Sequence, residues 1–226
     1  ESNPSASVNT DKMLYHCMSC GEGLSETQFI QKVLETGLVQ AKRIQSAFNT
    51  EEDVLTWSRE TLEPETKELC NKLGISDDVI EKLKLKTTNM TLHSIDFPVI
   101  MYGKLLDVRS YHPGGKPKLK GRQGSPTGLI IPYDQWVESS VKRTTIICAG
   151  EKDMAVARSN ELNAITLTGG EMAKPLFLAP FRERNVVICY DNDEAGLKGA
   201  TQLATQLTGV ANSVRVCTKF HEGMEL

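Results

Sequence analysis

The chain has 226 residues, of which 39% are hydrophobic and 24% are charged, and its formal net charge is −3. This balance is typical of a globular protein and excludes disordered and collagen-like classes. No apolar run approaches the ~20 residues that a membrane helix needs, so we expect no membrane partner. The chain starts at Glu1 without a methionine and has no signal-peptide pattern, so we expect a piece of a longer polypeptide.

Among the six cysteines, only Cys17 and Cys20 lie close together. This distribution indicates a reducing compartment, the cytoplasm, rather than a disulfide scaffold. Cys17-x-x-Cys20 followed by Gly21 has the spacing of a zinc knuckle, in which a turn brings two thiolates onto one metal. Zinc takes four ligands, so the other pair is expected upstream of Glu1, with His16 as a further candidate. A chance pair of cysteines under a hairpin stays open as the alternative.

Helical patterns dominate the first part of the chain. Ser25-Glu-Thr-Gln28 has the form of a capping box and predicts that a helix begins there. Residues 37–86 stay helical and strongly charged, which favours a connector over a catalytic unit. Within them, Gly74 is expected as the C-cap of one helix and Ser76 as the N-cap of the next.

The pattern changes to strands after about residue 92. Residues 96–101 and 104–109 flank a Tyr-Gly turn and predict a hairpin, and residues 128–133 form another short apolar run. Residues 144–148 and 186–190 are almost continuously apolar, as expected of parallel strands buried on both faces.

Two shorter apolar runs, at 164–167 and 213–217, belong to the same layer. Helical segments at about 153–160 and 194–207 alternate with these strands. Strands that alternate with helices predict a parallel α/β layer.

Acidic residues follow both long strands of this layer. Glu151 and Asp153 come after the first, and Asp191 and Asp193 come after the second. Ligands of open α/β sheets bind beyond the carboxyl ends of the strands, and in an extended chain residues i and i+2 point the same way. Carboxylates gathered there suit Mg²⁺ or Mn²⁺, and two such ions support phosphoryl chemistry. The alternative is that Asp191 and Asp193 only cap the helix near residue 194.

A basic segment precedes the acidic one. Residues 104–122 carry a net charge of +5, and the basic side chains are Lys104, Arg109, Lys116, Lys118, Lys120 and Arg122. A basic loop ahead of an acidic site is what a nucleic-acid enzyme needs, because cations hold phosphates while acids hold the catalytic ions. An ordinary solvated loop is the alternative.

These motifs resemble those of the Toprim primases, the bacterial replicative primases and phage primase-helicases. Asp191-Asn-Asp-Glu-Ala-Gly196 is similar to the family's Asp-x-Asp-x-Ala-Gly motif, and Gly150-Glu-Lys-Asp153 resembles its Glu-Gly-x-x-Asp motif. Thr166-Leu-Thr-Gly-Gly170 stands where the family has a glycine turn. Tyr15-His-Cys-Met-Ser-Cys-Gly-Glu-Gly23 looks like the second half of its zinc ribbon, and Asn71-Lys-Leu-Gly-Ile-Ser76 resembles its small helical element.

Three features depart from the family pattern. Ala149 stands where the family usually has a glutamate that is held to be a metal ligand or general base. The first pair of zinc ligands is absent from this sequence. The further acids that relatives carry after the last strand have only Glu222 and Glu225 as stand-ins.

The resemblance implies an α/β fold with a Toprim parallel sheet flanked by helices, a small mixed α/β subdomain before it, a helical linker and part of a zinc ribbon. The implied boundaries are 1–36 for the partial zinc ribbon and its following helix, 37–90 for the helical connector, 91–142 for the basic subdomain and 143–226 for a C-terminally truncated Toprim subdomain.

The implied activity is that of a DNA primase, which synthesises RNA primers on single-stranded DNA from ribonucleoside triphosphates by two-metal nucleotidyl transfer. Glu151, Asp191 and Asp193 are the implied ligands of Mg²⁺ or Mn²⁺, and Asp153 is a ligand or base. The implied binding residues for nucleic acid or nucleotide are the six basic residues above with Lys152, Gly169 and Gly170. Zinc is implied at Cys17 and Cys20.

A replicative helicase, separate or fused, is the implied protein partner, and a phage or mobile element in a bacterial cell is the implied origin. Two rival functions stay open. One is a primase-like DNA-binding or loading module without synthesis, which Ala149 favours, and the other is a Toprim nuclease.

Overall fold

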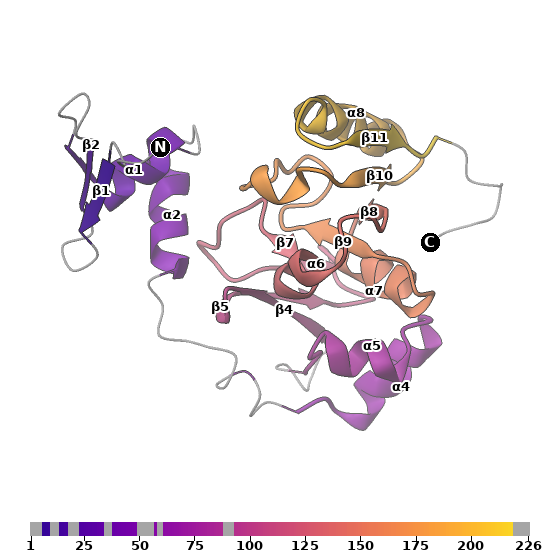
Figure 1. Cartoon of the computed structure of the whole chain (residues 1–226). Helices are drawn as coiled ribbons and strands as arrows, with labels where there is room; N and C mark the ends of the chain where they lie inside the picture. The colour runs from indigo at the N-terminus through magenta and orange to yellow at the C-terminus, as the bar shows by residue number, and fades with distance from the viewer. Residues whose placement is uncertain are drawn as a thin grey trace. The chain divides into compact units, whose positions relative to one another are not determined.

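The computed structural model describes residues 6–9, 14–17, 23–33, 38–48, 57, 61–87 and 93–218 (Figure 1). The chain divides into two compact units, Glu1–Thr50 with Gly124–Pro126, and Glu51–Gln123 with Thr127–Leu226. Among the described residues, none of the helices has both the length and the hydropathy required to cross a membrane.

The smaller unit consists of a three-stranded antiparallel sheet and two helices. Its elements are β1 (Ala6–Asn9), β2 (Leu14–Cys17), β3 (Gly23–Ser25), α1 (Glu26–Val33) and α2 (Leu38–Phe48). The predicted capping box is confirmed, because the Ser25 amide donates to Gln28 Oε1 at 2.9 Å and the Gln28 amide donates to Ser25 Oγ at 3.4 Å. The side chains of the two cysteines predicted to bind zinc, Cys17 and Cys20, lie outside the described residues.

The larger unit begins with a short helical pair. Its helices are α4 (Pro64–Lys72) and α5 (Asp77–Lys82). Gly74 has φ +84° after the end of α4, and the Ile75 amide donates back to the Cys70 carbonyl at 2.9 Å, as in a Schellman motif. Ser76 Oγ accepts from the Val79 amide at 3.4 Å and caps α5. The predicted N-cap is therefore confirmed, whereas the C-cap of α4 is Leu73 and Gly74 is the left-handed residue after it.

A three-stranded antiparallel sheet follows. Its strands, in spatial order, are β4 (Ile95–Met101), β5 (Lys104–Tyr111) and β6 (Leu119–Lys120). Tyr102 and Gly103 connect β4 to β5 with φ values of +54° and +73°. Two positive φ values in a two-residue loop are the geometry that a tight hairpin requires, and glycine adopts it at little cost. The predicted hairpin is confirmed.

The second sheet has five strands in the order β11-β10-β8-β9-β7 (Figure 1). Their bounds are β7 (Ile130–Ile131), β8 (Thr145–Cys148), β9 (Ala164–Leu167), β10 (Asn185–Cys189) and β11 (Ser213–Val216). Four strands run parallel, as predicted, whereas β7 pairs antiparallel with β9 at the edge. The predicted α/β fold class is confirmed.

Three helices and a 3₁₀ turn accompany this sheet. They are α6 (Tyr133–Glu138), α7 (Glu151–Ser159), η2 (Ala179–Phe181) and α8 (Glu194–Leu207). α8 has the predicted bounds, whereas α7 begins two residues earlier than the predicted start at 153. That earlier start changes the direction of the acidic side chains on α7.

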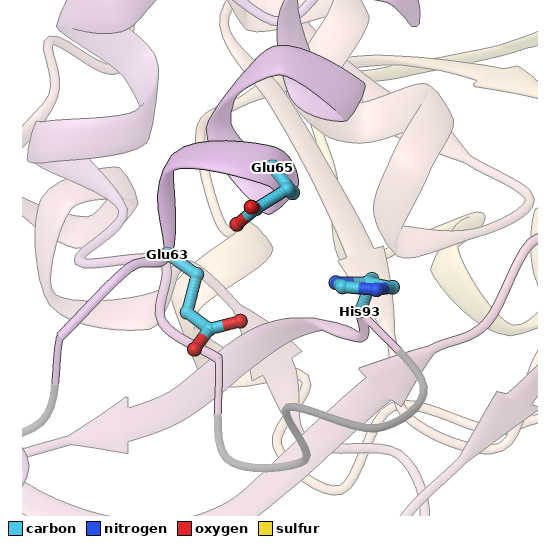
Figure 2. Close-up of side chains that lie close together, drawn as sticks. All are labelled: Glu63, Glu65 and His93. Atoms are coloured by element: carbon cyan, nitrogen blue, oxygen red, sulfur yellow. The ribbon is translucent and has the colours of Figure 1, made fainter.

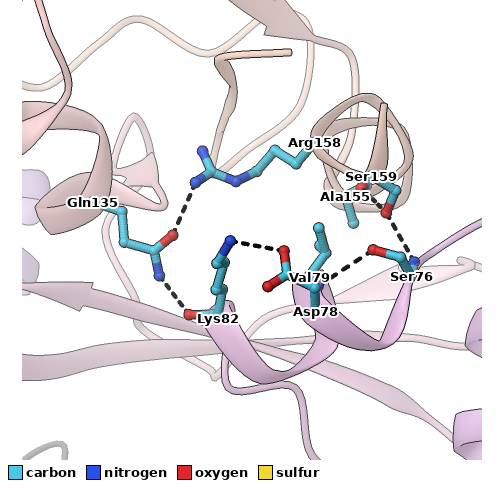
Figure 3. A network of polar contacts seen from close by, with 8 residues as sticks. All are labelled: Ser76, Asp78, Val79, Lys82, Gln135, Ala155, Arg158 and Ser159. Atoms are coloured by element: carbon cyan, nitrogen blue, oxygen red, sulfur yellow. Dashed lines mark hydrogen bonds and ion pairs between the residues drawn. The ribbon is translucent and has the colours of Figure 1, made fainter. Parts of the chain in front are cut away.

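Polar contacts attach the helical pair to α7 (Figure 3). The Ser76 amide donates to Ser159 Oγ at 2.9 Å, and the Ser159 hydroxyl donates to the Ala155 carbonyl at 3.0 Å. Arg158 Nη2 donates to Gln135 Oε1 at 2.9 Å, and the Gln135 amide donates to the Lys82 carbonyl. These bonds tie α5, α6 and α7 together within the larger unit.

A buried arginine holds the end of α6. Arg184 is 2% exposed, and its guanidinium carbon lies 4.5 Å from the centroid of the Trp136 ring. Its nitrogens donate to the carbonyls of Pro180, Trp136, Val137 and Ser139 at 3.1–3.3 Å. Because the last carbonyls of a helix have no intrahelical donors, this one side chain supplies donors to partly buried carbonyls there, while the Trp136 carbonyl also accepts from the Ser139 amide and hydroxyl.

We expect Arg184→Met to lower the free energy of unfolding by about 3–5 kcal/mol, because four carbonyls lose a donor and the contact of the guanidinium with the Trp136 ring is lost. Arg184→Lys should recover only part of the loss, since an ammonium lacks the planar fork of five N–H donors. Urea unfolding followed by circular dichroism measures both changes. Arg182→Met at a neighbouring exposed position is the control and should stay within about 0.5 kcal/mol. Equal losses at the two positions would refute this role.

Candidate active site at the edge of the parallel sheet

Strands β8 and β10 are parallel neighbours, and their last residues, Cys148 and Cys189, lie opposite each other. The chain segments that leave the two strands therefore start at the same edge of the sheet. After β8 the chain enters α7, whose first turn contains Asp153. After β10 it passes through buried Tyr190 to exposed Asp191. The fold thus places the acidic segments at one edge, as the strand order requires.

Asp191 and Asp193 differ in their local roles. Asp193 is the N-cap of α8, and its Oδ1 accepts from the Gly196 amide at 2.7 Å. Asp191 precedes the cap, and its main-chain amide donates to Glu171 Oε1 at 2.9 Å. The helix-capping alternative therefore accounts for Asp193 and leaves the exposed carboxylate of Asp191 without a structural explanation.

Glu171 is an acidic residue of this edge that the sequence analysis did not identify. It follows the turn after β9, in which Gly169 and Gly170 have φ values of +98° and +74°. Burial raises the pKa of the Glu171 carboxyl, the Asp191 amide opposes the shift, and the negative charges of Asp191, Asp193 and Asp153 raise it further. The signal that could have found it is a glutamate directly after a glycine turn at the end of a parallel strand.

Glu151, a predicted metal ligand, is buried, with 2% of its side chain exposed. Its Oε1 accepts from Arg109 Nε at 2.8 Å. Burial raises the pKa of Glu151, and the positive charge of Arg109 opposes this only in part. Since α7 begins at Glu151, the extended-chain geometry expected for Glu151 and Asp153 does not apply, and residues i and i+2 of a helix point in different directions. Arg109, predicted to bind nucleic acid, is 14% exposed in this pair.

Arg109 also faces a second buried acid. Asp107 Oδ2 lies 4.0 Å from Arg109 Nη1, and Asp107 Oδ1 accepts from the Arg122 amide at 2.8 Å. A Cβ atom on Gly121 would stand 2.3 Å from Arg109 Nη1, so the chain passes close over the guanidinium there and a larger residue would displace it. One arginine therefore joins β5, the chain after β6 and the start of α7.

The other predicted basic residues lie on the surface. The exposed ones are Lys104, Lys116, Lys118, Lys120 and Arg122. The loop that carries the lysines is closed by hydrogen bonds, because the His112 amide donates to the Lys118 carbonyl at 2.6 Å and the Gly115 amide donates to the His112 carbonyl at 2.9 Å. Lys152, in contrast, pairs with Asp153 at 2.9 Å at the acidic edge.

The donor set of the acidic edge suits Mg²⁺ or Mn²⁺, which prefer carboxylate oxygens. Among the described residues, the carboxylates of this edge do not form a group of three or more ligand atoms that all lie within 4.8 Å of one another. The side chains of Asp191 and Asp193 are exposed at this edge, and Asp193 Oδ1 accepts from the Gly196 amide at 2.7 Å.

A different group of ligand atoms meets that distance. Glu63 and Glu65 at the start of α4 lie with His93, and their ligand atoms all lie within 4.8 Å of one another (Figure 2). Glu65 and His93 are exposed and Glu63 is half-buried. This group is distinct from the acidic edge, so any measurement of metal binding has to account for it.

We expect Arg109→Met to destabilise the chain by about 3–5 kcal/mol, because the substitution leaves a buried carboxylate without its cation. The double variant Arg109→Met, Glu151→Leu should recover most of that loss, since removing both charges also removes the desolvation cost. Urea unfolding of the wild type, both single variants and the double variant gives the coupling energy. Additive losses in this cycle would contradict the pairing of Arg109 with Glu151.

Comparisons with known proteins agree with this architecture. Residues 146–224 match the family model described as Toprim-like, whereas no curated protein matches the chain. The Aquifex aeolicus primase structure, comprising zinc-binding and RNA polymerase domains, is similar with a TM-score of 0.55 and 16% identity over 100% of this chain and 71% of that chain. A DnaG catalytic core is similar with a TM-score of 0.56 and 13% identity over 87% of this chain and 73% of that chain. The chain therefore has the fold of DNA primase cores, with a Toprim-like domain at residues 146–224.

Proposed function

We propose that this chain is the core of a DNA primase that synthesises short RNA primers on single-stranded DNA. The observation that carries the proposal is the Asp191-x-Asp193 segment at the end of β10, beside β8, within a Toprim-like domain. The similarity to structures named as a primase and as a DnaG catalytic core supports the same activity.

In the proposed reaction, a ribonucleotide 3′-oxygen bonds to the α-phosphorus of the next nucleotide, and the bond to the pyrophosphate oxygen breaks. Divalent cations at the edge would neutralise the charge that develops on the attacking and leaving oxygens. Asp191 and Asp193 would hold these cations. Asp153, in the same electrostatic environment, would hold a cation or accept the hydroxyl proton. Glu151 would serve as a cation ligand or base while it is paired with Arg109 in the interior.

The exposed lysines of residues 104–122 would contact the phosphates of template, primer or triphosphate. Their loop is closed by main-chain hydrogen bonds, so the cations are presented on an ordered segment. Gly169 and Gly170 would let the turn after β9 approach a nucleotide closely, because neither carries a side chain. Zinc at Cys17 and Cys20, a replicative helicase as partner and a cytoplasmic location complete the proposal.

Ala149 supports a second candidate function, a primase-like module that binds or loads DNA without synthesis. The residue lies directly after β8, where the resemblance implies an acid. Binding of template without extension would favour this module, and cleavage of the template would favour a nuclease.

We expect Asp191→Asn and Asp193→Asn each to reduce primer synthesis at least 100-fold without loss of folding. Asparagine removes the charge that holds a cation, yet at residue 193 it still caps a helix. Extension of labelled ribonucleotides on single-stranded DNA with Mn²⁺ or Mg²⁺ measures synthesis, and thermal unfolding monitors folding. Glu138→Gln, at an exposed residue of α6, is the matched control and should keep wild-type activity. Wild-type synthesis by both aspartate variants would overturn the site.

We expect Lys118→Ala to weaken binding of single-stranded DNA and to reduce the salt dependence of binding by roughly one counterion, a change of about 0.7 in the slope of log K against log[salt]. Fluorescence anisotropy of a labelled oligonucleotide over a salt series measures both quantities. Lys72→Ala is the control, because Lys72 lies on α4 in an ion pair with Glu68. An unchanged salt slope for Lys118→Ala would exclude a phosphate contact there.

A further inference from the structure

Glu171 packs directly against α8, because two residues of this helix are glycines that carry no side chain. A Cβ atom on Gly199 would stand 2.4 Å from the Glu171 carbonyl oxygen. A Cβ atom on Gly196 would stand 2.9 Å from Glu171 Oε1 and 2.1 Å from the Asp191 carbonyl oxygen. Both glycines lie in the first half of α8 and are buried. The main chain and the carboxyl group of Glu171 are therefore both fixed at the beginning of this helix.

The carboxyl group of Glu171 lies among other acids. Its Oε1 accepts the Asp191 amide at 2.9 Å, and the charges of Asp191, Asp193 and Asp153 all act on it. No cationic side chain of the described residues is among these influences. Glu151 differs in this respect, because the guanidinium of Arg109 neutralises it. Lys152 pairs with Asp153 at 2.9 Å, and the mutual repulsion of Glu171, Asp191 and Asp193 is an environment that a divalent ion relieves.

Glu171 lies at the edge of the sheet where Ala149 replaces the acid that the resemblance implies. Strand β8 lies between β9 and β10, and Ala149 is the first residue after it. The Thr166 hydroxyl donates to the Cys148 carbonyl at 3.0 Å, which fixes the end of β9 against the end of β8. The turn that carries Glu171 thus leaves the strand next to Ala149 at the same edge.

We propose that Glu171 supplies, to the divalent-cation site of this edge, the carboxylate that Ala149 does not. The inference rests on the proposed function, since it assigns a further ligand to the same cation site. If Glu171 is a ligand, its negative charge is needed for cation binding, in addition to the hydrogen bond that its oxygen accepts from the Asp191 amide.

Binding of Mn²⁺ to the chain, measured by electron paramagnetic resonance without DNA or nucleotide, tests this role. All variants carry His93→Ala, so that the group of Glu63, Glu65 and His93 does not contribute. Glu171→Gln keeps an oxygen acceptor for the Asp191 amide and removes the charge. We expect it to weaken Mn²⁺ binding at least tenfold, while the thermal midpoint without metal stays the same or rises because repulsion is relieved. Adding Ala149→Glu to this variant should restore most of the affinity.

Two outcomes would overturn the inference alone. If Glu171→Gln binds Mn²⁺ as the parent does while Glu171→Ala binds weakly, Glu171 acts only by holding the Asp191 amide. If Asp193→Asn loses Mn²⁺ and Glu171→Gln retains it, the cation site stands without Glu171. If Asp191→Asn and Asp193→Asn both bind Mn²⁺ as the parent does, the cation site itself is wrong, and the proposed function fails together with the inference.

Discussion

Repulsion between carboxylates at one edge of the parallel sheet is the constraint on which the functional interpretation depends. The negative charges of Asp191, Asp193 and Asp153 act there on Glu171, which is partly buried. Such an arrangement costs free energy in an empty protein, and Gly196 and Gly199 enforce it by admitting the Glu171 turn against α8. A ligand that binds only the folded state stabilises it, so a divalent cation bound at this edge, as proposed, would favour the fold that builds the edge.

A buried arginine holds two further acids of the larger unit. Arg109 lies between Glu151 and Asp107, which are both buried, and it pairs directly with Glu151. The pair joins β5 of the antiparallel sheet to α7 of the parallel layer. It therefore fixes the strand that leads to the lysine loop relative to the helix that carries Asp153. In the proposed active site, substrate phosphates would contact both the basic surface and the acidic edge, so a fixed relation between the two would matter.

Local signals made much of the fold predictable. The capping box at Ser25, the Schellman motif at Gly74 and the Tyr102-Gly103 turn each depend on a few adjacent residues, and α8 has the expected bounds. The environment of Glu151 was not predictable in this way, because its partner Arg109 is 42 residues away and no periodicity links them. The sequence pattern also did not predict that α7 starts at Glu151, so that the side chains of Glu151 and Asp153 point in different directions. Tertiary packing decides both features.

The position of Glu171 bears on how such sites are recognised. Adjacent parallel strands end at the same edge, so an acid lost after one strand can be replaced from the turn after its neighbour. The affinity of a cation depends on the position and charge of the oxygens around it and does not depend on which chain segment supplies them. In a motif that is compared along one strand only, Ala149 is a missing acid. In the sheet, however, β9 lies beside β8, and Glu171 accepts a hydrogen bond from the Asp191 amide. The requirement for activity in such a fold is therefore better expressed as charge at a sheet edge than as residues within a single motif.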